Sequence, residues 1–293
     1  MADNKIILSL WGGEHTLDKE TLNYTINRDC GLFSNLTVGM YGIMKYHSLG
    51  YAPTTISLCL NEYKYDYDFY YDLFKPNNIN LNFDDISESE MFNFFRYCEP
   101  NSLGLGRRKI DVNFNILNKI LTKYFTLSDT CSQIIDNILL KHNINLNNTV
   151  FIWARKTDKV FETDIPTPET YINILSKNNL INKDIILQTD DISVLNEFKL
   201  LGLNFRTLDE LPYSYTNNGF HIRMSTTYDD EQFINEFNMS KVEYLQKLLS
   251  LSKIASMCKY SVVYPGCLTT LIPIFKNNFN NQFSFINKKS LIE

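Results

Sequence analysis

The first part of the chain alternates apolar runs of strand length with an apolar stretch of helical spacing. KIILSL at 5–10 predicts a strand, and TTISLCL at 54–60 predicts a second one. Between them, apolar residues recur at helical spacing up to Gly50, which is typical of a helix end. This order of strand, loop, helix and strand is typical of a layered α/β fold with a parallel sheet.

The next part of the chain has a weaker pattern. Residues 61–110 are dense in Tyr, Phe, Asp and Asn with little periodicity, so we interpret them as irregular or helical decoration. Residues 112–142 predict two helices, and Ser128 or Asp129 is a suitable N-cap for the second.

After NINLNN at 143–148 the alternation of strands and helices starts again. Strands are predicted at 149–155, 184–190, 203–208 and 261–264, and helices at 168–181, 193–202 and 239–260. Such a series predicts a second parallel sheet with covering helices. We therefore expect two domains, an α/β domain at 1–145 and a Rossmann-like domain at 146–293.

Composition narrows the class of protein. The 293 residues are 44% hydrophobic and 21% charged, the balance of a soluble globular protein. A net charge of -5 argues against a non-specific nucleic-acid partner, which carries a basic face to neutralise phosphates. The six cysteines are scattered without a C-x-x-C pair, which favours free thiols over a zinc site. The sequence shows neither a secretory signal pattern nor an apolar run of about 20 residues, so we expect a cytoplasmic protein without a transmembrane segment.

Two charged clusters follow neighbouring predicted strands. The first comprises Arg155, Lys156, Asp158 and Lys159, and the second begins with Asp190 and Asp191. Ligands of open α/β sheets bind beyond the carboxyl ends of the strands, where adjacent parallel strands would bring both clusters together. Arg and Lys beside a helix N-terminus can bind a diphosphate, and a carboxylate can accept two hydrogen bonds from guanine. The alternative is that these are solvated loop charges, with Asp191 as a helix cap.

The second half resembles the GDP-fucose-dependent α1,6-fucosyltransferases and their Nod-factor and protein O-fucosyltransferase relatives. WARKTDKV at 153–160 resembles the family's H-V-R-R-T-D-K-V, and QTDDISVL at 188–195 resembles A-T-D-D-P-S-L-L. PETY at 168–171 resembles a proline-led helix start, and GFHIR at 219–223 resembles G-L-H-N-R. The helix, strand and small-residue turn at 255–270 complete the resemblance, which covers about residues 150–275 in order.

The resemblance implies a GT-B-like fold, in which two Rossmann-like domains face a cleft and the domain at 1–145 lies on the acceptor side. It also implies an inverting transfer of fucose to a glycan acceptor without a metal or cofactor. By position, Arg155 would bind the β-phosphate of GDP-fucose, and Asp190 or Asp191 would read guanine. Further donor contacts would come from His221 and Arg223. Cys267, Thr269 and Thr270 would lie in the turn that contacts phosphate.

Three positions depart from the family pattern. Trp153 replaces a histidine that helps to hold guanine, so the base would stack or would be another base. Lys156 replaces the second arginine and keeps the charge without the bidentate geometry. Thr163 stands where the family has its catalytic glutamate, so we expect Glu162, or else Asp164, to act as the base, with Lys159 as a relay.

These departures leave two rival functions open. One is an inverting transferase that uses another nucleotide sugar, and the other is a catalytically inactive module that binds a nucleotide sugar or glycan. The acidic run 229–231 could suggest a metal site, but such runs are favourable at a helix start, which is the reading we prefer.

Overall fold

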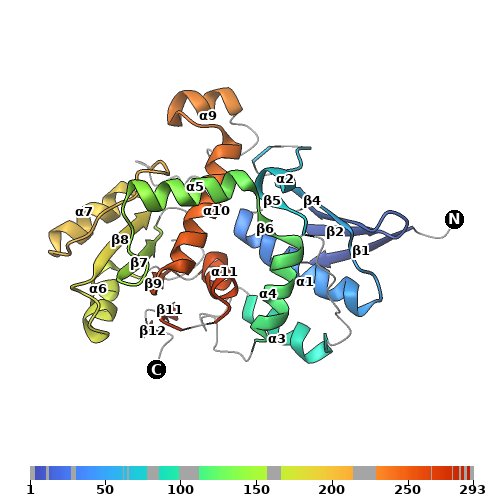
Figure 1. Cartoon of the computed structure of the whole chain (residues 1–293), viewed down its shortest axis with the longest axis horizontal. Helices are drawn as coiled ribbons and strands as arrows, with labels where there is room; N and C mark the ends of the chain where they lie inside the picture. Colours follow the sequence, from blue (N-terminus) through green and yellow to red (C-terminus); the bar gives the residue numbers. More distant parts are fainter. Residues whose placement is uncertain are drawn as a thin grey trace. The chain divides into compact units, whose positions relative to one another are not determined.

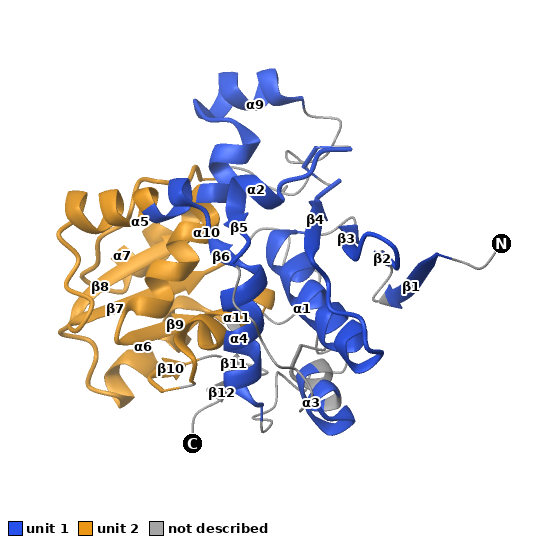
Figure 2. Ribbon diagram, turned by 45° about the vertical axis from the view of Figure 1, so that its right-hand side comes forward, with its two compact units in different colours: residues 1–98, 110–132, 224–246 blue, residues 99–109, 133–223, 247–293 orange. Residues whose placement is uncertain are grey.

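The structure is a computed structural model of the whole chain (Figure 1). It describes the chain except for residues 1–3, 11–12, 28–30, 62, 65, 78–85, 99–111, 157–165, 214–228, 265, 279, 284, 287–288 and 291–293. The chain forms two units, which Figure 2 shows in different colours. Unit 1 comprises 1–98, 110–132 and 224–246, and unit 2 is built mainly on 133–223 and 247–293. Residues 224–246 thus belong to unit 1, whereas the sequence analysis expected a single boundary at residues 145 and 146.

Unit 1 contains a four-stranded sheet in the order β1-β2-β3-β4. Its elements are β1 (Lys5–Leu10), β2 (Gly13–Asp18), β3 (Asn23–Asn27), α1 (Leu32–Ser48) and β4 (Thr55–Cys59). β1, β2 and β3 pair antiparallel, and α1 connects β3 to β4, which run parallel. The strands predicted at 5–10 and 54–60 are confirmed, and β2 and β3 are additions that the sequence analysis did not predict.

The rest of unit 1 is largely helical. It contains α2 (Tyr70–Leu73), β5 (Phe74–Lys75), α3 (Glu88–Cys98), α4 (Phe114–Tyr124), β6 (Thr126–Leu127) and α9 (Asp230–Phe237). The two helices predicted at 112–142 are confirmed as α4 and α5 (Asp129–Lys141). Ser128 caps α5, because its Oγ accepts a hydrogen bond from Cys131 N at 3.2 Å.

Unit 2 contains a parallel sheet in the order β10-β9-β7-β8. Its elements are β7 (Thr149–Ala154), α6 (Pro168–Lys177), β8 (Asp184–Thr189), α7 (Ile192–Leu200), α10 (Lys241–Met257), β9 (Tyr260–Val263), α11 (Cys267–Lys276) and β10 (Gln282–Phe283). The short strands β11 (Phe285–Ile286) and β12 (Lys289–Ser290) pair antiparallel. The unit boundaries fall within α5 and α10. The predicted α/β class with a parallel sheet is confirmed. The prediction of a strand at 203–208 is wrong, because only Arg206 of this segment forms a bridge to β8.

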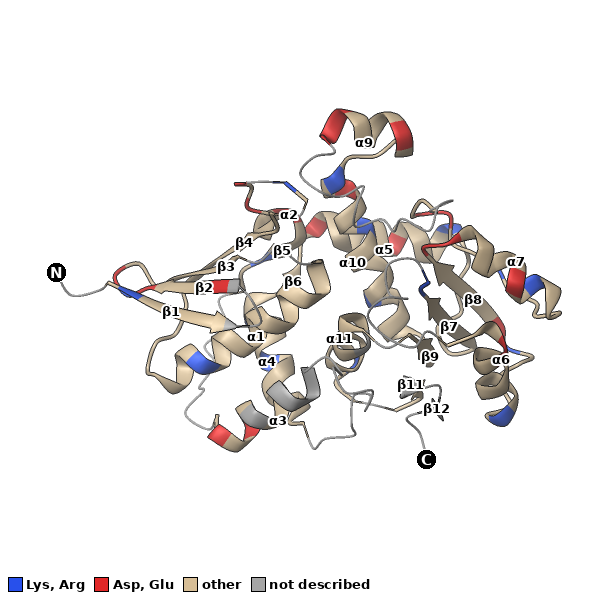
Figure 3. Cartoon of the chain, turned by 180° about the vertical axis from the view of Figure 1, so that it is seen from behind, with Lys and Arg blue, Asp and Glu red and all other residues tan. Residues whose placement is uncertain are grey.

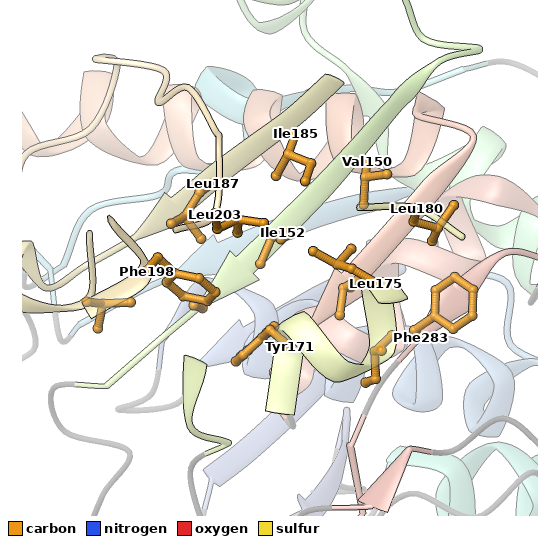
Figure 4. Packing of buried hydrophobic residues seen from close by; sticks show 14 of the residues in the cluster. Val150, Ile152, Tyr171, Leu175, Leu180, Ile185, Leu187, Phe198, Leu203 and Phe283 are labelled. Carbon is orange, nitrogen blue, oxygen red and sulfur yellow. The ribbon is translucent and has the colours of Figure 1, made fainter. Parts of the chain in front are cut away.

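One face of the unit 2 sheet packs on α6 and α7. Side chains of alternate strand positions, such as Ile152 and Leu187, meet Tyr171, Leu175 and Phe198 from the two helices (Figure 4). All five are buried, at 1% exposure or less. This core holds β7 and β8 in register, which fixes the residues that follow the two strands.

No helix in the part of the chain that the structure describes is long and apolar enough to cross a membrane.

Candidate functional site

The strand register of unit 2 brings the two charged clusters together at the carboxyl edge of the sheet. Ala154, the last residue of β7, pairs with Thr189, the last residue of β8. The next residues are Arg155 and Asp190, and Arg155 Nε donates to Asp190 Oδ2 at 3.1 Å. The predicted meeting of the clusters is therefore confirmed for these two residues. Figure 3 colours the charged residues along the chain, including those that follow β7 and β8.

Asp190 also organises the backbone after β7. Its Oδ1 accepts a hydrogen bond from Lys156 N at 3.2 Å, so each carboxylate oxygen has a donor. The ammonium group of Lys156 reaches α7 instead, where it lies 2.6 Å from Glu197 Oε1 and 3.3 Å from Ser193 Oγ. The Lys156–Glu197 pair is about two-fifths exposed, which limits its contribution to stability.

Asp191 serves the fold as the N-cap of α7. Its Oδ1 accepts from Ser193 N at 2.7 Å, and its own N–H donates to Thr189 Oγ1 at 3.2 Å. The side chain of an N-cap satisfies an N–H group that has no partner inside the helix. The cap considered in the sequence analysis is therefore confirmed, and a guanine contact from Asp190 or Asp191 stays a prediction.

The third strand of the edge, β9, contributes Tyr264. Tyr264 N donates to Trp153 O at 3.0 Å, which carries the pairing of β9 and β7 one residue further. The Arg155 guanidinium lies 5.9 Å from the centre of the Tyr264 ring, within reach of a cation–π interaction. Tyr264 was not predicted as a site residue, although this tyrosine ends the strand predicted at 261–264 and so lies at a strand end, where ligands of such sheets bind.

The helix α11 begins next to this tyrosine. Gly266 is its N-cap, and a Cβ at that position would lie 2.5 Å from Tyr264 Cε2. A side chain there would displace the tyrosine ring, so the glycine lets the start of α11 lie close to it. A helix N-terminus carries partial positive charge and favours anions.

Burial raises the pKa of a second tyrosine near the carboxyl edge of the sheet. Tyr171 of α6 is 1% exposed, and this burial raises the pKa of its hydroxyl well above the ordinary value. The neighbouring hydroxyl of Tyr264 and the carboxylate of Asp190 raise the pKa further. Tyr171 therefore stays neutral at physiological pH.

Some of the other predicted site residues lie in the part of the chain that the structure describes, and the rest lie outside it. Trp153 is buried at 5% exposure and packs against Phe151, with ring centres 5.8 Å apart. In α11, Thr270 is buried and Cys267 is partly exposed, while only the backbone of Thr269 is described. Outside the described residues lie Asp158, Lys159, Glu162, Asp164, His221 and Arg223.

The acidic run at 229–231 has a structural role. Asp229 caps α9 in a capping box with Gln232, and Asp230 pairs with Lys64 at 3.3 Å. The preferred reading as a helix start is confirmed. Within the part of the chain that the structure describes, no group of three or more His, Cys, Asp or Glu side chains is arranged to hold a metal ion.

Comparisons of the chain with known protein families and with curated proteins return no match.

Proposed function

We propose that the chain is an inverting glycosyltransferase of GT-B architecture that transfers L-fucose from GDP-fucose to a hydroxyl group of a glycan without a metal ion. The donor, the reaction and the two-domain architecture come from the resemblance of residues 150–275 to α1,6-fucosyltransferases. The structural observation that supports the proposal is the ion pair of Arg155 and Asp190 at the carboxyl edge of the unit 2 sheet.

Arg155 suits the role of the group that receives the leaving diphosphate. Transfer breaks the bond between the sugar and the β-phosphate, and negative charge accumulates on the departing GDP. Arg155 is 18% exposed and is oriented by Asp190, so its guanidinium is a pre-positioned and partly desolvated cation. Such groups lower the barrier because they need no reorganisation during the reaction. The positive end of α11 acts in the same direction.

The acceptor hydroxyl needs a base as it attacks the anomeric carbon. Glu162 is the proposed base, with Asp164 as the alternative and Lys159 as a relay. The carboxylate takes the hydroxyl proton, the new bond between acceptor oxygen and sugar forms, and GDP leaves with the electrons of the broken bond.

A calorimetric titration tests the donor assignment. GDP, UDP and their sugar conjugates are titrated into the whole chain, first without added metal and then with EDTA. We expect GDP and GDP-fucose to bind in preference to the uridine compounds and to keep their affinity in EDTA. A preference for UDP, or no binding of any nucleotide, would overturn the donor assignment.

A further inference from the structure

The residue Gln188 lies just inside the carboxyl edge of the unit 2 sheet. It is the penultimate residue of β8 and pairs in register with Trp153 of β7. Its neighbour Leu187 belongs to the core on the α6 and α7 side, and side chains alternate along a strand. The side chains of Gln188 and Trp153 therefore share the opposite face of the sheet.

The side-chain amide of Gln188 has one oriented donor and one unused acceptor. The residue is 1% exposed, and its Nε2 donates to Thr189 O at 3.3 Å. This bond fixes the amide orientation, because the reversed amide would place two oxygens against each other. Among the described residues, none donates a hydrogen bond to Oε1. Buried side-chain acceptors nearly always have a partner, so each exception calls for an explanation.

The strand register places this acceptor one pleat below the residues that end the two strands. Gln188 precedes Asp190 by two residues, and Trp153 precedes Arg155 by two residues. Two residues of a strand span about 6.6 Å, and in GDP the ribose and the α-phosphate together separate the base from the β-phosphate. The nearby carboxylates already have donors, since Asp190 accepts from Arg155 and Lys156.

We infer that Gln188 is the residue that selects the nucleobase of the donor, with its Oε1 accepting a hydrogen bond from an N–H group of the guanine Watson–Crick edge. Trp153 provides the flat apolar surface beside it. The inference rests on the proposed function and goes beyond it, since it assigns base recognition to Gln188 in place of Asp190 or Asp191. A site built to hydrogen-bond its ligand discriminates strongly against ligands that lack the donor.

The test separates the contribution of the base to binding affinity from the contribution of the diphosphate. GDP and inorganic pyrophosphate are titrated into the wild-type chain and into Gln188→Leu, which has similar size without the acceptor. We expect the variant to bind GDP about tenfold more weakly, because it loses one net hydrogen bond to the base. Its affinity for pyrophosphate should equal that of the wild type. Equal affinity of both proteins for GDP would overturn the inference, and so would a parallel loss for pyrophosphate.

A second measurement uses only the wild-type protein and is independent of the folding of any variant. Inosine diphosphate lacks the exocyclic amine of guanine, and N1-methyl-GDP lacks the N1–H donor. We expect one of the two to bind about tenfold more weakly than GDP, and equal binding of all three would overturn the inference. If the wild type binds pyrophosphate and GDP equally, only the inference fails. If it binds neither, the proposed function fails with it.

Discussion

The two edges of the unit 2 sheet each carry an arginine–aspartate pair, and the two pairs differ in geometry. At the amino edge, Arg206 donates to both oxygens of Asp184, from Nε at 3.0 Å and from Nη2 at 2.6 Å. At the carboxyl edge, Asp190 divides its oxygens between Arg155 Nε and the backbone N–H of Lys156. The first arrangement is the bidentate fork that joins two segments of a fold, while the second positions one arginine.

The two pairs also differ in their further hydrogen bonds and in their exposure to solvent. Arg206 also donates from Nη1 to His142 O, and Thr149 Oγ1 donates to Asp184 Oδ2 at 3.0 Å. Both members of the pair therefore have further hydrogen bonds to neighbouring residues of unit 2. The pair of Arg155 and Asp190 is more buried, at 18% and 17% side-chain exposure against 33% and 32% for Arg206 and Asp184. Lower exposure strengthens the interaction of a charge with an anionic ligand. From this comparison we propose that the pair at the amino edge stabilises the fold and that the pair at the carboxyl edge binds the ligand.

The largest expected effect concerns the segment that follows Arg155. Replacing the proposed base in Glu162→Gln is expected to lower kcat about 10²- to 10⁴-fold, because general-base catalysis contributes that much. Donor affinity should stay at the wild-type value, since the change removes no phosphate contact. Fucosyl transfer and GDP titration measure the two effects. Asp164→Asn is the matched variant, and full turnover in both would exclude this pair of residues as the base.

Arg155→Ala is expected to weaken GDP binding about 100-fold, because a charge-assisted fork to phosphate is lost. Arg155→Lys keeps the charge without the fork, so its affinity should fall between those of the alanine variant and the wild type. Calorimetry measures both, and thermal melting checks that the variants fold. If the alanine variant binds GDP as tightly as the wild type, the proposed difference in function between the two edges of the sheet is contradicted.

Arg206→Ala is the counterpart at the amino edge. We expect it to lower the free energy of unfolding by about 2 kcal/mol, as hydrogen bonds to a charged group are removed and Asp184 loses its fork. GDP affinity should not change. Urea unfolding and calorimetry provide the two readouts, and a loss of GDP affinity comparable to that of Arg155→Ala would contradict the assignment of this edge to stability.

Asp191→Ala tests a carboxyl-edge residue whose observed role is structural. Loss of the α7 cap is expected to lower the free energy of unfolding by about 1 kcal/mol, and Asp191→Ser should restore most of it because serine also caps helices. If Asp191 instead reads guanine, both variants will bind GDP more weakly while pyrophosphate binding is kept. Urea unfolding and a nucleotide titration separate the two roles.

The smallest expected effect is a pH dependence at the amino edge. The hydrogen bonds from Arg206, and then the one from Thr149, hold the pKa of Asp184 below its ordinary value of 3.8, although burial of the carboxyl group acts in the opposite direction. A lowered folded-state pKa gives stability that is complete above pH 3.8 and is lost as the pH falls through the folded value. The difference in urea midpoint between wild type and Asp184→Asn should therefore be constant near neutral pH and shrink below pH 3.8. A difference that stays constant down to pH 2 would show that the carboxylate charge contributes nothing.

The sequence predicted the part of the fold that periodicity controls. Buried runs such as TVFIWA and DIILQT have the apolar continuity of parallel strands, and their register follows from the βαβ connection through α6. The meeting of Arg155 with Asp190 was predictable for the same reason. The antiparallel strands β2 and β3 were not predicted, because GEHTLD and NYTIN mix polar and apolar residues and their pairing is non-local.

Site details that depend on side-chain partners were beyond the sequence. Both carboxylates of the Asp190–Asp191 pair looked equally available, yet one orients Arg155 and the other caps α7. Gln188 was given no role because a glutamine in a strand has no chemical signature of its own. Only its burial, the bond to Thr189 O and its neighbour Trp153 single it out.

The most direct test of the central claim is a crystal structure of the whole chain with GDP. The account predicts the β-phosphate within hydrogen-bond distance of the Arg155 guanidinium and near the first turn of α11, with Asp190 still bonded to Arg155. A diphosphate bound away from the carboxyl edge of the unit 2 sheet would contradict it.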